Sequence, residues 1–188
     1  MIINGRFFKL CLLIFVLIPH VQVLGANVTE YGLKAVFLYN FTKFLTWPDK
    51  AFSNADAPLV IGILGDDPFG ETLNKTVEGK IINGRSIQVR RFDGFDPRQA
   101  AVIGKCHILF ICSSENDDIG EILASIKGFS VLTVSEYEGF PAKGGTILFF
   151  RKENRLALRI NLEAAKKARL QISSKLLQIS EIYTAEDN

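Results

Sequence analysis

The stretch Pro58-Leu-Val-Ile-Gly-Ile-Leu-Gly65 decides the fold, because its apolar residues run unbroken between a proline and a glycine. A short apolar run with such bounds is typical of a strand that is buried on both faces of a sheet. The stretches 106–112 (CHILFIC), 129–134 and 146–150 are also rich in apolar residues. We therefore expect these four segments to be the central strands of one sheet.

The segments between these strands carry helical patterns. Leu33, Phe37, Phe41 and Phe44 are spaced by four, four and three residues, which predicts a helix over 29–45. The residue before Pro48 avoids helical geometry, so this helix should end near that proline. Further helices are predicted at 69–78 and 117–127. Strands that alternate with helices indicate an α/β protein.

Tight turns add antiparallel pieces to this sheet. Asn83-Gly84 is a strong hairpin signal before a strand at 85–92, and a turn at 152–154 should join strands 146–150 and 156–160. Asn161 is a plausible cap for a last helix that reaches Tyr183. The predicted fold is a three-layer α/β sandwich with a mixed, mostly parallel central sheet flanked by helices. It includes an antiparallel hairpin near the C-terminus and a long C-terminal helix, in one domain over residues 27–188.

The N-terminus has the three parts of a secretory signal peptide. A short basic region with Arg6 and Lys9 precedes the apolar run 10–18, and small residues follow at Gly25 and Ala26. A membrane anchor is the alternative, but spanning the hydrocarbon core takes about 20 apolar residues. We expect residues 1–25 to be removed and the mature chain to work in the periplasm.

Removal of the signal peptide changes the composition. The whole chain has 22 basic and 20 acidic residues, and two of the basic ones lie in the signal peptide, so the mature protein is nearly neutral. Nucleic-acid binding needs a basic surface and is not expected. Cys106 and Cys112 would be roughly 20 Å apart on an extended strand, whereas a disulfide needs less than about 7 Å. Either both are buried free thiols, which we favour, or one pairs between chains.

The chain lacks the residue sets of common catalytic and cofactor sites. His107 is the single histidine of the mature chain, and its place in an apolar strand favours a packed, hydrogen-bonded side chain over a catalytic one. One histidine cannot form a multi-histidine metal site, and no dinucleotide fingerprint is present. Asp66 and Asp67 are interpreted as turn formers. We expect no catalytic residues, metal or cofactor.

Several blocks of the sequence, in order, are similar to those of the YfiR family. The longest are 30–48 (EYGLKAVFLYNFTKFLTWP) and 60–70 (VIGILGDDPFG), and the resemblance extends over about 30–183. Further blocks are Gly79-Lys80, Asn83-Gly84-Arg85, 106–111 (CHILFI), 132–135 (LTVS), Gly139-Phe140, Gly144-Gly145, Ile160-Asn161 and 170–177 (LQISSKLL). The resemblance also brings in redox-sensitive cysteines, which are associated with this family. Cys106 lies in one of these blocks but Cys112 does not, which puts a switch controlled by a disulfide in doubt for this chain.

The resemblance implies a periplasmic α/β sandwich that is not an enzyme. It implies repression of an inner-membrane diguanylate cyclase similar to YfiN, through contact with the periplasmic domain of that cyclase. A lipoprotein similar to YfiB would relieve the repression, and a homodimer is also implied. The alternative is a periplasmic protein that binds a small ligand for a sensor or importer, at strand ends near Asp66 and Ser113.

For the protein partner, we expect binding energy to concentrate in a few exposed apolar or arginine anchors. The candidates lie in the loop 140–145, in the hairpin 151–155 and on the last helix. They are Phe140, Lys143, Arg151, Lys152, Arg155 and Arg169. Simple solvation of a turn is the other explanation for the hairpin charges.

Overall fold

A computed structural model describes residues 29–184, and the predicted signal peptide lies outside the described residues. The helices are α1 (Glu30–Phe44), α2 (Glu71–Val77), α3 (Ala100–Ile103), α4 (Ile119–Ser125), α5 (Leu162–Lys167) and α6 (Ser174–Leu177). The strands are β1 (Leu45–Thr46), β2 (Leu59–Leu64), β3 (Ile81–Ile82), β4 (Arg85–Phe92), β5 (Ile108–Ile111), β6 (Leu132–Ser135), β7 (Ile147–Lys152), β8 (Arg155–Ile160), β9 (Gln171–Ile172) and β10 (Glu181–Ile182). In this part of the chain, no helix is long and apolar enough to cross a membrane.

The eight-stranded sheet has the order β10-β8-β7-β6-β5-β2-β4-β3. Strands β4, β2, β5, β6 and β7 pair in parallel. β2 lies between β4 and β5, so the central buried strand predicted from the apolar run 58–65 is confirmed. β8 pairs antiparallel with β7, and β3 pairs antiparallel with β4. The mixed, mostly parallel sheet and the hairpin near the C-terminus are confirmed.

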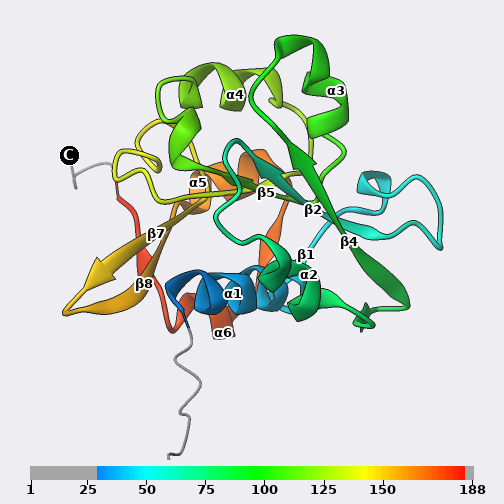
Figure 1. Cartoon of the computed structure of the whole chain (residues 1–188), viewed down its shortest axis with the longest axis horizontal. Helices are drawn as coiled ribbons and strands as arrows, with labels where there is room; N and C mark the ends of the chain where they lie inside the picture. Colours follow the sequence, from blue (N-terminus) through cyan, green and yellow to red (C-terminus); the bar gives the residue numbers. More distant parts are fainter. Residues whose placement is uncertain (1–28, 185–188) are drawn as a thin grey trace, which may run out of the picture.

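Helices cover both faces of the sheet, so the molecule has three layers. Figure 1 shows α1 and α2 on one side of the sheet and α3 and α4 on the other. The molecule has two hydrophobic cores, one on each face of the sheet. Alternate residues of a strand pack in one core or the other, because successive side chains of a strand point to opposite faces. Ile61 and Ile63 of β2 pack in the core beneath α1, whereas Val60 and Leu64 pack in the core beneath α4.

The two predicted hairpin turns form as expected. Asn83 and Gly84 have positive φ values of 50° and 79°, and Glu153 and Asn154 have positive φ values of 47° and 62°. Two consecutive residues with positive φ match the twist of the strands that a two-residue hairpin loop joins. The turn at 153–154 therefore sets the register of β7 and β8, in which Lys152 lies opposite Arg155.

The predicted long C-terminal helix is wrong. Asn161 does cap α5, since its side chain accepts a hydrogen bond from the Ala164 amide, but α5 ends at Lys167. Arg169 has a φ of 58°, and the Leu170 amide donates to the Ala165 carbonyl at 3.0 Å, so a Schellman motif closes this helix. The rest of the segment consists of β9, α6 and β10, and Leu176 of α6 is buried in the core beneath α1.

Both cysteines of the described chain are buried free thiols, as favoured. His107 is a packed, hydrogen-bonded side chain, as predicted. Its Nδ1 accepts a hydrogen bond from the Val60 amide at 3.0 Å, and its ring stacks on Phe52 at a centroid distance of 4.4 Å. Asp67 forms a turn, because its Oδ1 accepts from the Phe69 amide at 2.7 Å. These side chains therefore stabilise the fold through packing and local hydrogen bonds.

Candidate functional site

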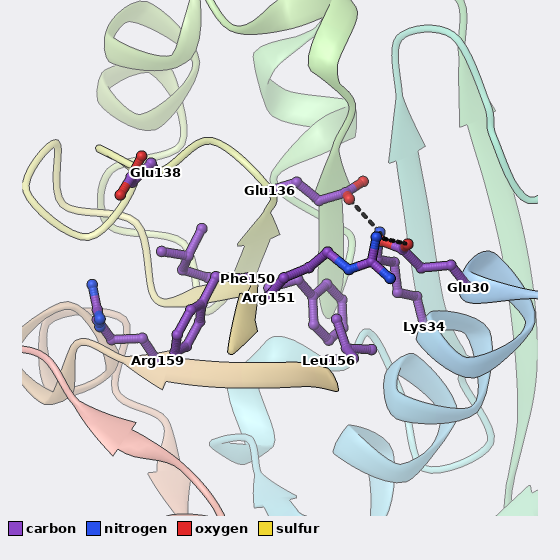
Figure 2. A pocket seen from close by; sticks show the side chains of 10 residues that line it. Glu30, Lys34, Glu136, Glu138, Phe150, Arg151, Leu156 and Arg159 are labelled. Atoms are coloured by element: carbon purple, nitrogen blue, oxygen red, sulfur yellow. Dashed lines mark hydrogen bonds and ion pairs between the residues drawn. The ribbon is translucent and has the colours of Figure 1, made fainter. Parts of the chain in front are cut away.

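A cleft of about 350 Å³ lies where the carboxyl ends of the parallel strands meet the N-terminus of α1. Ligand sites of open α/β sheets occur at this edge of the sheet. Figure 2 shows that α1, the segment that follows β6 and the β7–β8 hairpin surround the cleft. The lining residues are Glu30, Lys34, Glu136, Glu138, Leu148, Phe149, Phe150, Arg151, Leu156 and Arg159.

Lys34 is the buried charge of this cleft. Its residue is only 1 % exposed, and its Nζ lies 2.6 Å from Glu30 Oε1, one turn earlier on α1. The same Nζ also donates a hydrogen bond to Glu136 Oε1. A buried ammonium is tolerated only when it is paired and hydrogen-bonded, and the two carboxylates provide this. Glu136 directly follows β6, so Lys34 ties α1 to the sheet.

Tyr31 strengthens the same connection. Its hydroxyl donates to Glu136 Oε2 at 3.1 Å, and Lys34 Nζ lies 4.3 Å from the centroid of its ring. Burial and the nearby Glu136 carboxylate raise the pKa of Tyr31 to about 12. The hydrogen bond from Lys34 lowers the pKa of Glu30. Tyr31 therefore stays a hydrogen-bond donor, and Glu30 stays an anion at neutral pH.

The β7–β8 hairpin forms the basic wall of the cleft. Arg151 is 63 % exposed, and its Nη1 lies 3.7 Å from Glu30 Oε2. Lys152 and Arg159 both bind Glu181 of β10, at 2.6 Å and 3.0 Å. An exposed guanidinium is a common anchor in protein interfaces. Lys152 and Arg159 are bound within the domain, so Arg151, with its long and exposed ion pair, is the cation of this wall that is suited to an acidic group of a partner.

Most of the charged side chains that line the cleft bind one another. Two of its carboxylates, Glu30 and Glu136, bind cations. The described part of the chain has no group of three or more His, Cys, Asp or Glu side chains that could hold a metal ion. Lys34 Nζ is bound by the two carboxylates Glu30 and Glu136, so its role in the cleft is to connect them.

The structure divides the predicted site residues between two ends of the sheet. Arg151, Lys152 and Arg155 lie together on the hairpin beside the cleft. Arg169 lies at the opposite edge, where its Nη1 donates to the Gly128 carbonyl at 3.3 Å. Lys143 also lies away from the cleft. It precedes the first residue of β7, whereas the cleft is lined by later residues of this strand. Only the hairpin residues can act as one surface with the cleft.

Phe140 is not a surface anchor. It is fully buried in the core beneath α4. A Cβ atom on Gly145 would lie only 2.3 Å from the Phe140 ring, so a glycine is required at 145 for this packing. Phe140 therefore holds the loop against the domain and offers no side chain to a partner.

Lys143 lines a second groove of about 530 Å³ between α4 and α5. Leu123, Phe129 and Ala164 give this groove an apolar surface, and Lys127 and Lys167 lie with Lys143 among its lining residues. Thr133 and Thr146 lie in the wall of the groove and hydrogen-bond to each other at 3.1 Å. The groove is separate from the cleft beside the hairpin.

The strand ends near Asp66 and Ser113, which we considered for a small ligand, are occupied by internal hydrogen bonds. The Asp66 amide donates to Ser114 Oγ at 3.0 Å, and this hydroxyl donates to Glu115 Oε1 at 3.1 Å. Glu115 Oε2 in turn accepts from the Phe95 amide at 2.9 Å. These polar groups bind one another and connect the loops.

Sequence reasoning missed the acidic and buried part of the cleft. Glu30 and Lys34 have the i, i+4 spacing of a helical ion pair, which is a readable signal. Glu136 lies two residues after the strand predicted at 129–134, and Arg159 alternates with the apolar residues of another predicted strand. No sequence signal indicates that Glu136 meets α1, because the two are more than one hundred residues apart in the chain.

Comparison with known protein families shows to which family this chain is related. A family described as YfiR/HmsC-like matches residues 31–181, which is most of the chain. The chain belongs to the YfiR/HmsC-like family. At the family level, membership supports a regulatory rather than catalytic role in cyclic-di-GMP signalling in the periplasm. No curated protein matches the sequence in a direct comparison.

A solved structure supports the fold of this YfiR/HmsC-like chain. It is the crystal structure of a conserved domain protein from Vibrio cholerae, with a TM-score of 0.55 and 10 % sequence identity. The match covers 82 % of this chain and 60 % of that chain. Such a likeness shows a common fold, and the remainder of the Vibrio protein has no counterpart in the match.

Proposed function

We propose that this chain is a periplasmic, non-enzymatic regulator that binds the periplasmic domain of a YfiN-like diguanylate cyclase and represses it. Membership of the YfiR/HmsC-like family supports the signalling role. The signal peptide predicted at 1–25 supports the compartment, and residues 27–188 would then be the working domain. A YfiB-like lipoprotein that releases the repression and a homodimeric state belong to the same proposal.

The hairpin beside the cleft is the observation that carries this proposal. Arg151, Lys152 and Arg155 project from the β7–β8 hairpin, whose two strands belong to the eight-stranded sheet. A binding surface on such a scaffold loses little conformational entropy when a partner docks. We assign the contact with the cyclase to this hairpin and the cleft, without Phe140, Lys143 or Arg169.

The test is deletion and complementation in a cell that contains such a cyclase. Deletion of the chain should raise cellular cyclic-di-GMP, and the wild-type chain should lower it again. The triple variant Arg151→Glu, Lys152→Glu and Arg155→Glu should be exported and folded but should fail to lower it, because reversed charges repel an acidic partner.

A matched control carries the same number of charge reversals elsewhere. Lys75, Lys80 and Lys105 are exposed and lie outside the hairpin and the cleft. Their change to glutamate should leave repression intact. Unchanged cyclic-di-GMP after deletion would contradict the proposed function, whereas equal loss in both triple variants would contradict its assignment to the hairpin.

The groove between α4 and α5 favours a second candidate function, binding of a small ligand. Its volume of about 530 Å³ and its apolar lining are in the range of small-molecule pockets. A ligand that binds the folded chain raises its melting temperature. A thermal-shift screen with amphipathic anions should therefore give a rise that Lys143→Glu abolishes, and a blank screen would remove this candidate.

A further inference from the structure

Strand β7 extends beyond its parallel neighbour. β6 pairs with β7 only at Val134↔Ile147 and Ser135↔Leu148, whereas β7 continues to Lys152. On its other side, β7 is paired with β8 along its whole length. Among the residues that the structure describes, no strand pairs with the β6 side of β7 after Leu148. This open edge, residues 149–152 of β7, borders the cleft, since Phe149, Phe150 and Arg151 line it.

The backbone groups that face the open edge follow from the hairpin register. In an antiparallel pair, residues alternate between those bonded to the partner strand and those that point away from it. The Asn161 amide bonds to the Thr146 carbonyl, so the even-numbered residues of β7 bond to β8. The N–H and C=O of Arg151 therefore point into the open edge. An extended segment that adds to a sheet needs such backbone groups to hydrogen-bond with.

We propose that an extended, acidic segment of the partner protein adds to β7 as a further strand at this open edge. This inference rests on the proposed function, for which it supplies the mode of binding. The added strand would lie in the cleft between the hairpin and α1, and the N–H and C=O of Arg151 would bond to its backbone. Side chains of such a strand alternate between the two walls of the cleft.

The charges of the hairpin identify the partner segment as acidic. Within 151–159, four cations stand against one acidic residue, Glu153. Lys152 and Arg159 share Glu181 of β10, so the cations left for a partner are the exposed Arg155 and Arg151, whose Nη1 lies 3.7 Å from Glu30 Oε2. Acidic side chains of an added strand would face Arg151 and Arg155 on the hairpin side, away from the carboxylates beside α1, while Leu148 and Phe150 offer an apolar contact in the same cleft. Opposite charges on neighbouring strands stabilise their pairing.

The same charges disfavour a second copy of this chain as the occupant. Pairing of two β7 edges would bring Arg151 and Lys152 of both copies together. Like charges directly opposite each other destabilise a sheet, and basic residues on an edge strand are a common means of preventing self-association. The open edge is therefore suited to a different protein.

A proline substitution isolates the backbone bond. The Arg151 amide points away from β8, so Arg151→Pro removes the N–H of the open edge and leaves the bonds between β7 and β8 in place. Arg151→Gln is the matched control, because it removes the same charge but keeps the N–H. Thermal melting of both variants of the mature chain checks that the domain remains folded.

The probe is the purified periplasmic domain of the YfiN-like cyclase. Arg151→Gln should weaken its binding a few-fold, and Arg151→Pro should weaken it at least about tenfold further, because a buried backbone hydrogen bond is lost. In the unchanged chain, hydrogen–deuterium exchange at Arg151 should slow in the complex. Binding should also weaken with added salt, since charges contribute to it.

The outcomes separate the two proposals. Equal affinities of Arg151→Pro and Arg151→Gln, with unprotected exchange at Arg151 in the complex, would overturn strand addition and leave the proposed function standing. Absence of any binding by the unchanged chain would overturn both. If Arg151→Pro does not fold, the exchange measurement on the unchanged chain alone decides.

Discussion

At the residue scale, Lys34 shows how a buried charge fixes the position of a helix. Its ammonium is within the domain, whereas Glu30 and Glu136 keep 40 % and 28 % of their side chains exposed. Water therefore still solvates part of the carboxylates, and the desolvation penalty falls mainly on the lysine. An apolar residue at 34 could pack equally well against the sheet, but it would form no ion pair with Glu136. The ion pair specifies how α1 meets the end of β6.

His107 is a second buried polar residue, and its role is different. Trp47 and Phe52 pack against its ring, and Trp47 Nε1 donates to the His107 carbonyl at 3.0 Å. Burial and the nearby Arg85 guanidinium lower the pKa of His107 from 6.5 to about 4. The neutral imidazole accepts the Val60 hydrogen bond, which a protonated Nδ1 cannot do.

This pKa predicts a loss of stability in acid. Between pH 6.5 and 4, the unfolded chain binds a proton at His107 that the folded chain does not, so the free energy of unfolding falls as the pH falls. His107 alone should lower it by about 2 kcal/mol between pH 7.5 and pH 5. Urea unfolding of the mature chain at a series of pH values measures this.

His107→Asn is the control, because its amide oxygen can take the place of Nδ1 but does not titrate. The variant should be less stable at pH 7.5, and its free energy of unfolding should decrease less steeply down to pH 5. Parallel pH curves for the variant and the wild-type chain would contradict a lowered pKa of His107. Carboxylates contribute equally to both curves, so their titration cancels in the difference.

At the scale of elements, the C-terminal segment shows how one sequence pattern can arise from two structures. Ala165, Ile172 and Leu176 all pack in the core beneath α1, at the seven- and four-residue spacings of a helix stripe. The chain reaches these positions through a helix, a turn, a strand and another helix. β9 pairs with β1, at Leu45↔Ile172 and Thr46↔Gln171, and this distant pairing outweighs the local helical preference.

Substitution of Arg169 discriminates between these two structures. With a φ of 58° at 169, glycine is the residue that fits best, so Arg169→Gly should be about 0.5–1 kcal/mol more stable than Arg169→Ala. In a continuous helix, glycine would instead be less stable than alanine by about 1 kcal/mol. The sign of the difference in urea unfolding therefore decides.

Both variants remove the contact between the Arg169 guanidinium and the Gly128 carbonyl, so this loss cancels in the comparison. Arg169→Ala alone, compared with the wild-type chain, measures that exposed contact and should lower stability only slightly. A higher stability of Arg169→Ala than of Arg169→Gly would contradict the Schellman motif at 165–170.

At the scale of the whole molecule, the features that follow from short-range patterns could be predicted. Apolar runs bounded by turn residues gave β2, β5, β6 and β7, and the spacing of the phenylalanines gave α1. Asn83 and Asn154 sit at turns whose positive φ suits asparagine. The short strands β1, β9 and β10 carry no such pattern, because long-range pairing alone creates them.

The cleft could be predicted only in part for the same reason. The hairpin charges were visible as a local cluster, and Arg151, Lys152 and Arg155 do lie together. Burial of Phe140 depends on how the loop 137–145 folds over the core beneath α4, which the sequence does not reveal. The partnership of Lys34 with Glu136 requires the order of strands in the sheet, and that order is a property of the entire chain.

The two cysteines test whether both cores belong to one cooperative unit. Cys106 packs in the core beneath α4, and Cys112 packs in the core beneath α1. Burial raises the pKa of each thiol to about 12, so neither reacts with iodoacetamide until the chain opens. Cys106→Ala and Cys112→Ala each leave one thiol in the mature chain as a reporter of one core.

If the sheet unites both layers, each thiol should become labelled only through global unfolding. After correction for the stability of each variant, the two labelling rates at pH 8 should agree within about twofold. Both should also rise with urea at the slope of global unfolding, since that slope reflects the surface exposed. A thiol that is labelled much faster, with a shallow dependence on urea, would show that its helical layer opens alone. Such opening beneath α1 would free the cleft wall that Lys34 holds, and the binding surface would then no longer be rigid.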